Sequence, residues 1–238
     1  MSSLFVFGDS FTYGMKESET HYEERHEGQL ENCFVNLIGK HYNLNVKNYS
    51  QPGTSNYIQT AELFKNLITK KIKSNDIVIF GITSPSRNPE VLDYRGKYYI
   101  DRYLFSYFNT LMQINNYSQY FHKNILVLKL FEDPVVRHHV AATPKQYSQQ
   151  DIFDYIKNLK PIYFIPFTTV DILLDNLKAL PNHLHHERLK IDSSHKKYFQ
   201  PKGHPSEEGH IKIADYLIKY IDKNFKNFIP LVDPFIYD

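Results

Sequence analysis

Three observations predict an α/β domain built on a mainly parallel sheet. Short apolar runs that end at glycine or polar residues recur along the chain, as in strands buried on both faces of a parallel sheet. Segments with helical spacing of apolar residues separate these runs, which favours βαβ units with helices on both sides of the sheet. The length of 238 residues suits one such domain. We therefore expect a single domain over residues 1–238, with insertions near residues 84–100 and 134–200.

The strand candidates share continuous apolar composition and a turn-forming end. The first is LFVF at residues 4–7, which stops at Gly8, and the run IVIF stops in the same way at Gly81. A weaker candidate ends at the turn-rich stretch SQPGTSN, and PIYFIPF is a candidate fifth strand. In chain order the predicted strands are residues 4–7, 44–48, 77–80, 125–128 (continuing to Leu130) and 161–167.

Helical patterns lie between and after these strands. The clearest is the last one, where Pro205 and Ser206 precede Glu207 and Glu208, and apolar residues then recur at helical spacing up to Ile221. Acidic residues at this position favour a helix start, because the N-terminus of a helix carries a partial positive charge. The other predicted helices are residues 33–38, the segment after Asn56, and residues 104–112, 148–159 and 170–180.

Charge and cysteine content limit the classes of partner and compartment. The 28 basic and 26 acidic residues leave a formal charge of +2, so we expect no nucleic-acid or membrane partner. Cys33 is the single cysteine, so no intramolecular disulfide can form and a reducing compartment is favoured. The apolar run at residues 4–7 is too short for a signal peptide, and no later run approaches the ~20 residues of a membrane span. We expect a cytoplasmic or otherwise intracellular protein.

Polar and glycine-rich loops follow the first three predicted strands. Ser10 lies in GDSFTYG, Gly53 in SQPGTSN, and Thr83 in FGITSPSR. Because the carboxyl ends of parallel strands meet at one edge of a sheet, these loops should converge there. His204 precedes the last helix, which starts at the opposite edge if it packs antiparallel to the strands. A loop that returns over the carboxyl edge would instead bring His204 beside Ser10, and the sequence leaves both arrangements open.

Four motifs in fixed order resemble one family of enzymes. FGDSFTYG, NYSQPGTSN, FGITSPSR and GHPSEEGH, which together extend over nearly the whole chain, resemble the motif series of the SGNH (GDSL-like) hydrolases. Gly-Asp-Ser alone is common in turns, but GHPSEEGH before a helix makes the combination fairly specific. The sequence has no G-x-S-x-G elbow, which argues against the ordinary α/β-hydrolase fold. The resemblance implies a three-layer α/β/α, flavodoxin-like domain.

The resemblance also implies a serine hydrolase that cleaves an ester through an acyl-serine intermediate. The implied activity is that of an O-deacetylase or short-chain esterase on a small-molecule or carbohydrate ester, with Ser10 as nucleophile and His204 as general base. A serine hydroxyl is a poor nucleophile at neutral pH, and a neutral imidazole can accept its proton. The amides of Ser10 and Gly53 and the side chain of Thr83 would bind the oxyanion, and Arg87 is a candidate for stabilising it or for gripping the substrate.

Two positions depart from the family pattern. Thr83 stands where the family usually has an asparagine, and a hydroxyl reaches less far than an amide. Pro201 stands where an acid usually lies three residues before the histidine, so a backbone carbonyl, Asp192 or another carboxylate would have to orient His204, unless a Ser-His dyad operates. These departures keep two alternatives open: a catalytically weak glycan- or protein-binding module, and an acyltransferase that uses the same serine.

Simpler interpretations compete with the catalytic ones. Ser10 is also a suitable N-cap for a first helix, and His210 lies on the last helix at a packing or surface position. The histidine-rich stretch NHLHHERLKIDSSH lacks the ligand spacing of a zinc site, and the Gly8–Gly14 loop lacks a phosphate-binding motif. We therefore expect neither a metal nor a cofactor.

Overall fold

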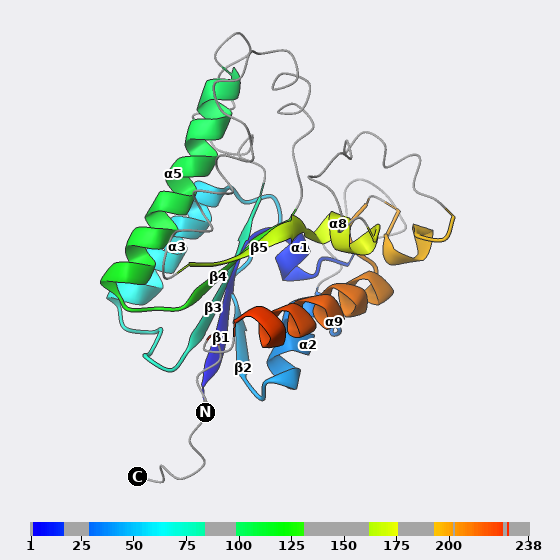
Figure 1. Cartoon of the computed structure of the whole chain (residues 1–238), viewed down its shortest axis with the longest axis horizontal. Helices are drawn as coiled ribbons and strands as arrows, with labels where there is room; N and C mark the ends of the chain where they lie inside the picture. The colour runs from blue at the N-terminus through cyan, green and yellow to red at the C-terminus, as the bar shows by residue number, and fades with distance from the viewer. Residues whose placement is uncertain are drawn as a thin grey trace.

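Five parallel strands form the centre of the molecule. The computed structural model describes residues 2–16, 29–83, 99–130, 162–175, 193–201, 203–225 and 228. The sheet has the order β2-β1-β3-β4-β5, and each neighbouring pair is parallel (Figure 1). This strand order is that of flavodoxin-like folds. The strands are β1 Ser3–Phe7, β2 Asn45–Asn48, β3 Ile77–Ile82, β4 Ile125–Lys129 and β5 Ile162–Thr168. The last of them confirms the strand predicted at PIYFIPF.

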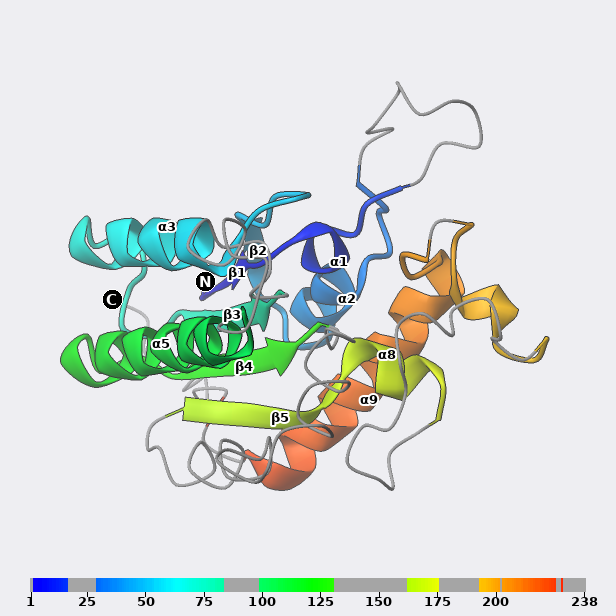
Figure 2. The ribbon, with the colours of Figure 1, turned by 90° about the horizontal axis from the view of Figure 1, so that it is seen from above.

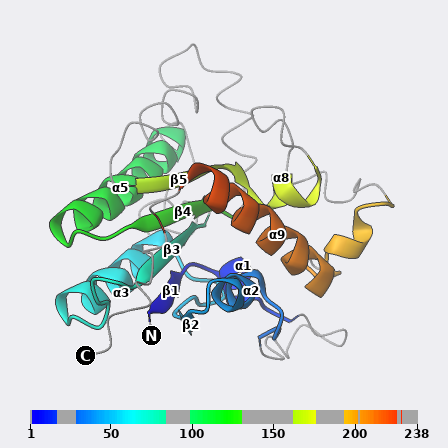
Figure 3. The ribbon, with the colours of Figure 1, turned by 60° about the horizontal axis from the view of Figure 1, so that its bottom comes forward.

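Helices cover both faces of the sheet, which confirms the three-layer α/β/α prediction. Figures 2 and 3 show α3 and α5 side by side on one face, and α2 and α9 on the other. The insertions expected near residues 84–100 and 134–200 lie largely outside the described residues, as does the helix predicted at 148–159. The described helices are α1 Ser10–Tyr13, α2 Phe34–His41, α3 Asn56–Ile68, α5 Tyr99–Tyr120, α8 Thr169–Leu173, the 3-10 helix η3 Lys196–Tyr198 and α9 Glu207–Asn224.

The continuous apolar sequence of β1 follows from burial on both faces. Leu4 and Val6 belong to the cluster that includes α2 and α9, whereas Phe5 and Phe7 belong to the cluster with α3 and α5. All four side chains are fully buried. Because successive strand residues point to opposite faces, each cluster needs alternate residues of the same run to be apolar. The amino-terminal strand thus joins the two halves of the core.

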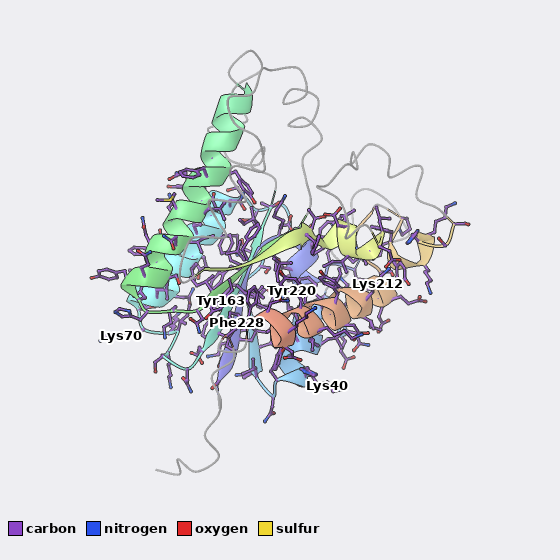
Figure 4. All side chains as sticks on the ribbon, in the orientation of Figure 1. Lys40, Lys70, Tyr163, Lys212, Tyr220 and Phe228 are labelled. Carbon is purple, nitrogen blue, oxygen red and sulfur yellow. The ribbon has the colours of Figure 1, made fainter. Side chains whose placement is uncertain are left out.

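An aromatic cluster packs the carboxyl-terminal end of α9 against β5. The ring of Tyr163 on β5 lies 5.0 Å from those of both Phe225 and Phe228, and Tyr220 lies 5.6 Å from Phe225. Figure 4 shows Tyr163, Tyr220 and Phe228 close together. The edge-to-face angles of 65° to 71° are those that aromatic pairs favour. This cluster fixes α9 along the sheet, and α9 begins three residues after His204.

The start of α9 agrees with the sequence prediction. The Ser206 hydroxyl caps the helix by accepting a hydrogen bond from the Gly209 amide at 3.1 Å, and Glu207 and Glu208 occupy the first turn. Within the described ranges, no helix combines the length and apolarity that crossing a bilayer would require.

Candidate active site

The loops after β1, β2 and β3 leave the same edge of the sheet, as predicted. Two hydrogen bonds tie the first loop to its neighbours: Gly8 donates to Gln59 Oε1 of α3 at 3.0 Å, and Gln51 donates from its amide to the Gly8 carbonyl at 3.1 Å. The segment that bears Gly53 is therefore anchored next to the segment that bears Ser10.

Ser10 and His204 meet at this edge, although 194 residues separate them in the sequence. Ser10 Oγ lies 2.9 Å from His204 Nε2, a hydrogen-bond distance between a hydroxyl and an imidazole nitrogen. The Phe11 ring packs beside the imidazole, with a centroid distance of 5.4 Å. Of the two arrangements left open by the sequence, the structure has the loop that returns over the carboxyl edge.

Asp9, and not Ser10, caps the first helix. Asp9 Oδ1 accepts from the Phe11 amide at 2.9 Å, and Ser10 is the first residue of α1. The interpretation of Ser10 as a plain N-cap is therefore wrong. Because Asp9 takes over the capping, the Ser10 side chain can point at His204.

Two glycines allow α1 to sit close to the sheet. A Cβ at Gly8 would lie 2.3 Å from Thr12 Oγ1, and one at Gly81 would lie 2.6 Å from Thr12 Cγ2. Gly8 also has φ of +155°, in a region that residues with a side chain avoid. The helix that begins at Ser10 can thus rest on the end of β3 only with glycine at both positions.

Thr83 has a different bonding pattern from the one we expected. Its hydroxyl donates to Asp9 Oδ2 at 2.6 Å, and Asn56 pairs with its backbone amide and carbonyl at 2.9 Å each. A hydroxyl has one proton to donate. In this geometry the Thr83 hydroxyl donates its proton to Asp9, so the side chain braces the loop that bears Ser10 and has no proton left for a substrate oxygen.

The backbone amides of Ser10 and Gly53 are the remaining candidates for oxyanion donors. Within the described residues, neither amide has a hydrogen-bond acceptor. Gly53 adopts φ of +75°, and a Cβ built there would meet nothing within 4 Å. Backbone groups beside open space suit the close approach of a ligand.

The loop that carries His204 contains no acid at the position where the family has one. Pro201 occupies that position and is exposed. The neighbouring Gln200 donates from Nε2 to the carbonyls of Met15 and Pro205 at 2.8 and 2.7 Å. Sequence reasoning missed Gln200, and the only signal was its place beside the departure at Pro201.

His210 is a buried packing residue behind His204. Its Nδ1 accepts from the Phe34 amide at 3.3 Å, at the first turn of α2, where Cys33 provides no side-chain cap. Burial, assisted by the nearby His204, lowers the pKa of His210 from 6.5 to about 3. The imidazole is therefore neutral at physiological pH, as its acceptor role at Nδ1 requires.

Several candidates fall outside the described residues. Arg87, Asp192 and the histidines at positions 183, 185 and 186 belong to this group. Among the residues that the structure describes, no cluster of three or more histidine, cysteine, aspartate or glutamate side chains could hold a metal. His195, which is described, pairs with Asp175 at 3.2 Å.

Comparisons with known proteins place this geometry in a structural context. No protein-family model and no curated protein sequence matches the chain. Solved structures do match over most of its length. A member of the lipolytic protein G-D-S-L family from Veillonella parvula is 15% identical with a TM-score of 0.53, and covers 95% of this chain and 100% of its own.

Two esterases show the same likeness. The psychrotrophic esterase EstA from a Pseudoalteromonas species is 14% identical, with a TM-score of 0.56 and coverage of 95% of this chain and 100% of EstA. Axe2, an acetyl xylan esterase from Geobacillus stearothermophilus, is 17% identical, with a TM-score of 0.54 and coverage of 92% and 94%. With the strand order and the motif series, these matches identify the fold of this chain as that of the SGNH (GDSL-like) hydrolases.

Proposed function

We propose that this protein is a serine hydrolase that cleaves an ester through an acyl-Ser10 intermediate. The observation that carries the proposal is the 2.9 Å contact between Ser10 Oγ and His204 Nε2 at the carboxyl edge of the sheet. A nucleophile within hydrogen-bond reach of a base is the signature of an activated serine. The esterase activities of EstA and Axe2, which share the fold, agree with this assignment.

His204 acts as a proton carrier in two half-reactions. With Nε2 unprotonated, it takes the proton of Ser10 as Oγ attacks the ester carbonyl carbon, and the tetrahedral intermediate carries the negative charge on the former carbonyl oxygen. The imidazolium then protonates the leaving alkoxide as its bond to carbon breaks, which leaves acyl-Ser10. Water, deprotonated by His204, attacks the acyl carbon in the second half, and Ser10 recovers its proton as the acid departs.

The Ser10 and Gly53 amides stabilise the tetrahedral oxyanion. Removal of one such donor typically slows an acyl-transfer enzyme by about 10²–10³. A two-amide oxyanion hole follows from the commitment of the Thr83 hydroxyl to Asp9. The substrate that we favour is a carbohydrate ester with a short acyl group. Axe2, which has the same fold, is an acetyl xylan esterase.

Two observations favour a second candidate, a weakly catalytic binding module with the same fold. Thr83 gives its proton to Asp9, and Pro201 replaces the acid that usually orients the histidine. Such a module would bind a glycan or protein without turning over an ester. An acyltransferase would keep the acyl-Ser10 intermediate and pass the acyl group to an alcohol in place of water.

Labelling by a fluorophosphonate tests the proposal. A phosphonate reacts with an activated serine hydroxyl, and the EstA structure is one inhibited by monoethylphosphonate. We expect labelling of the wild-type protein but not of Ser10→Ala, together with hydrolysis of p-nitrophenyl acetate that Ser10→Ala abolishes. Labelling of neither protein would favour the binding module. Labelling of wild type with acyl transfer to an added alcohol, faster than hydrolysis, would favour the transferase.

A further inference from the structure

Gln200 connects the two loops that carry the reactive side chains. Its Nε2 donates both amide protons, one to the Met15 carbonyl at 2.8 Å and the other to the Pro205 carbonyl at 2.7 Å. A primary amide has two N–H donors, and here each has a backbone acceptor. The bond to Met15 joins segments 185 residues apart in sequence.

Both acceptors lie next to a reactive residue. The Met15 amide donates to the carbonyl of Ser10 itself at 3.1 Å, so Met15 is bound directly to the backbone of the nucleophile. Pro205 is the residue after His204. A shift of the Gln200 amide would therefore change the position of the histidine loop relative to α1.

The backbone of Gln200 closes the histidine loop as well. Its amide donates to the His204 carbonyl at 2.7 Å, and its carbonyl accepts from the Gly203 amide at 2.9 Å. Gly203 adopts φ of +94°, which suits a tight turn that only glycine enters readily. An antiparallel bridge between Phe199 and Pro205 completes the loop. Backbone and side-chain bonds of one residue thus reach the carbonyls of two consecutive residues, His204 and Pro205.

We propose that Gln200 is a positioning residue: its carboxamide fixes the histidine loop against α1 and so sets the distance between Ser10 Oγ and His204 Nε2. The proposal rests on the function proposed above. It explains how the imidazole is placed in a chain where Pro201 stands in the position of the usual acid. Misplacement of a catalytic group by about 1 Å can cost about 10²-fold in rate, so the loss of this clamp should be measurable.

Gln200→Met tests the clamp, because methionine has a similar length and no N–H donor. We expect kcat for p-nitrophenyl acetate to fall by about 10–100-fold with KM changed less than about threefold, and fluorophosphonate labelling of Ser10 to slow in parallel. Gln29→Met is the matched control, since Gln29 lies opposite Met15 in an isolated bridge and its Nε2 contacts Cys33 Sγ at 3.4 Å. The control should keep wild-type kinetics.

The same substitution made in the His204→Ala protein separates positioning from general stability. If Gln200 acts through His204, adding Gln200→Met to His204→Ala should leave the residual activity unchanged, because the group being positioned is gone. A further loss of similar size in that background would overturn the proposal. Wild-type kcat in a folded Gln200→Met protein would also overturn it.

Gln200→Glu provides a second test of the clamp. If Gln200→Met fails to fold, Gln200→Glu, which keeps the side-chain length and has no donor when ionised, should show the same loss of kcat. Wild-type kcat in that variant, or failure of both variants to fold, would overturn the positioning role. If instead the wild-type protein shows no Ser10-dependent labelling, the proposed function has failed before any Gln200 variant is compared, so the two failures are distinguishable.

Discussion

The two loops that form the site are held in different ways. The loop that bears Ser10, the proposed nucleophile, is fixed by buried groups: Asp9 is completely buried, Ser10 is 4% exposed, and Thr83 is 2% exposed. Asp9 accepts from the Phe11 amide and the Thr12 hydroxyl at 2.9 and 3.0 Å within the loop, and the Thr83 hydroxyl donates to Asp9 at 2.6 Å, which links the ends of β1 and β3. The histidine loop lies nearer the surface, with Pro201 exposed, and depends on the Gln200 clamp and on the turn at Gly203.

Within the part of the chain that the structure describes, charged contacts at the surface lie near the histidine loop. Lys197 pairs with Glu208 at 3.5 Å, and both side chains are more than half exposed. Lys212 is less exposed and bridges Asp175 at 2.8 Å and the Leu173 carbonyl at 3.1 Å, which joins α9 to α8. Ser10, the proposed nucleophile, is thus placed by the sheet core, and His204, the proposed base, is placed by loop contacts. We call the Ser10 loop with the residues that contact it the nucleophile side, and the His204 loop with α9 the base side. The position of Ser10 should therefore be sensitive to substitutions in the core, and the position of His204 to substitutions in its loop.

The largest expected effect comes from removing either reactive side chain. Ser10→Ala and His204→Ala should each lower kcat/KM for p-nitrophenyl acetate by at least about 10³-fold, and the double variant should be no worse, because the pair acts as a unit. Melting temperatures near that of wild type serve as the folding control. Additive losses would mean that the two loops contribute independently.

Low pH should destabilise the folded protein through His210, which lies on α9. The pKa of this imidazole is about 3 in the folded protein and 6.5 when exposed, so the unfolded chain binds more protons between these values. The folding equilibrium constant is therefore highest above pH 6.5. As the pH falls from 6.5 toward 3, it decreases by up to about tenfold per pH unit.

His210→Phe isolates this contribution. The variant leaves the Phe34 amide without its acceptor and should unfold at lower urea than wild type at pH 7. The difference between the two proteins should shrink as the pH is lowered to 4, because only wild type gains a proton at this position on unfolding. A difference that stays constant from pH 7 to 4 would assign the titration to another group.

A smaller effect is expected on the nucleophile side from Thr83→Val. The substitution removes the proton donated to Asp9 and should lower the free energy of unfolding by about 1–3 kcal/mol. Because that proton does not face the substrate, kcat per folded molecule should fall less than about tenfold, and Thr83→Ser should restore stability. A loss of kcat of about 10²–10³ at unchanged stability would instead identify Thr83 as an oxyanion donor.

The smallest effect is expected at the exposed edge of the base side. Lys197→Ala removes a solvent-exposed ion pair and should change the free energy of unfolding by less than about 1 kcal/mol, with unchanged kcat. Urea titration with parallel ester assays checks this. A clear loss of kcat would show that positioning of His204 extends beyond Gln200 to the surface contacts.

The layers of the fold could be predicted from the sequence, and so could the choice of Ser10 and His204 as the candidate pair. The apolar run at residues 4–7 and its repeats are readable because a strand buried on both faces needs apolar residues at successive positions. The capped start of α9 is readable because capping and first-turn charge are local. The proposed site residues Ser10, Gly53 and His204 lie in motifs that follow the order of the SGNH motif series along the chain.

Tertiary structure alone decided how these residues meet. Asp9 occupies the N-cap position that Ser10 could have filled, and Thr83 donates its single proton to Asp9. Both contacts depend on the close approach of α1 to β3 that Gly8 and Gly81 allow. Gln200 bonds to Met15 across 185 residues of sequence. No local pattern encodes such a contact, because a polar side chain finds its partner only after the sheet has brought distant loops to one edge, where each buried donor needs an acceptor.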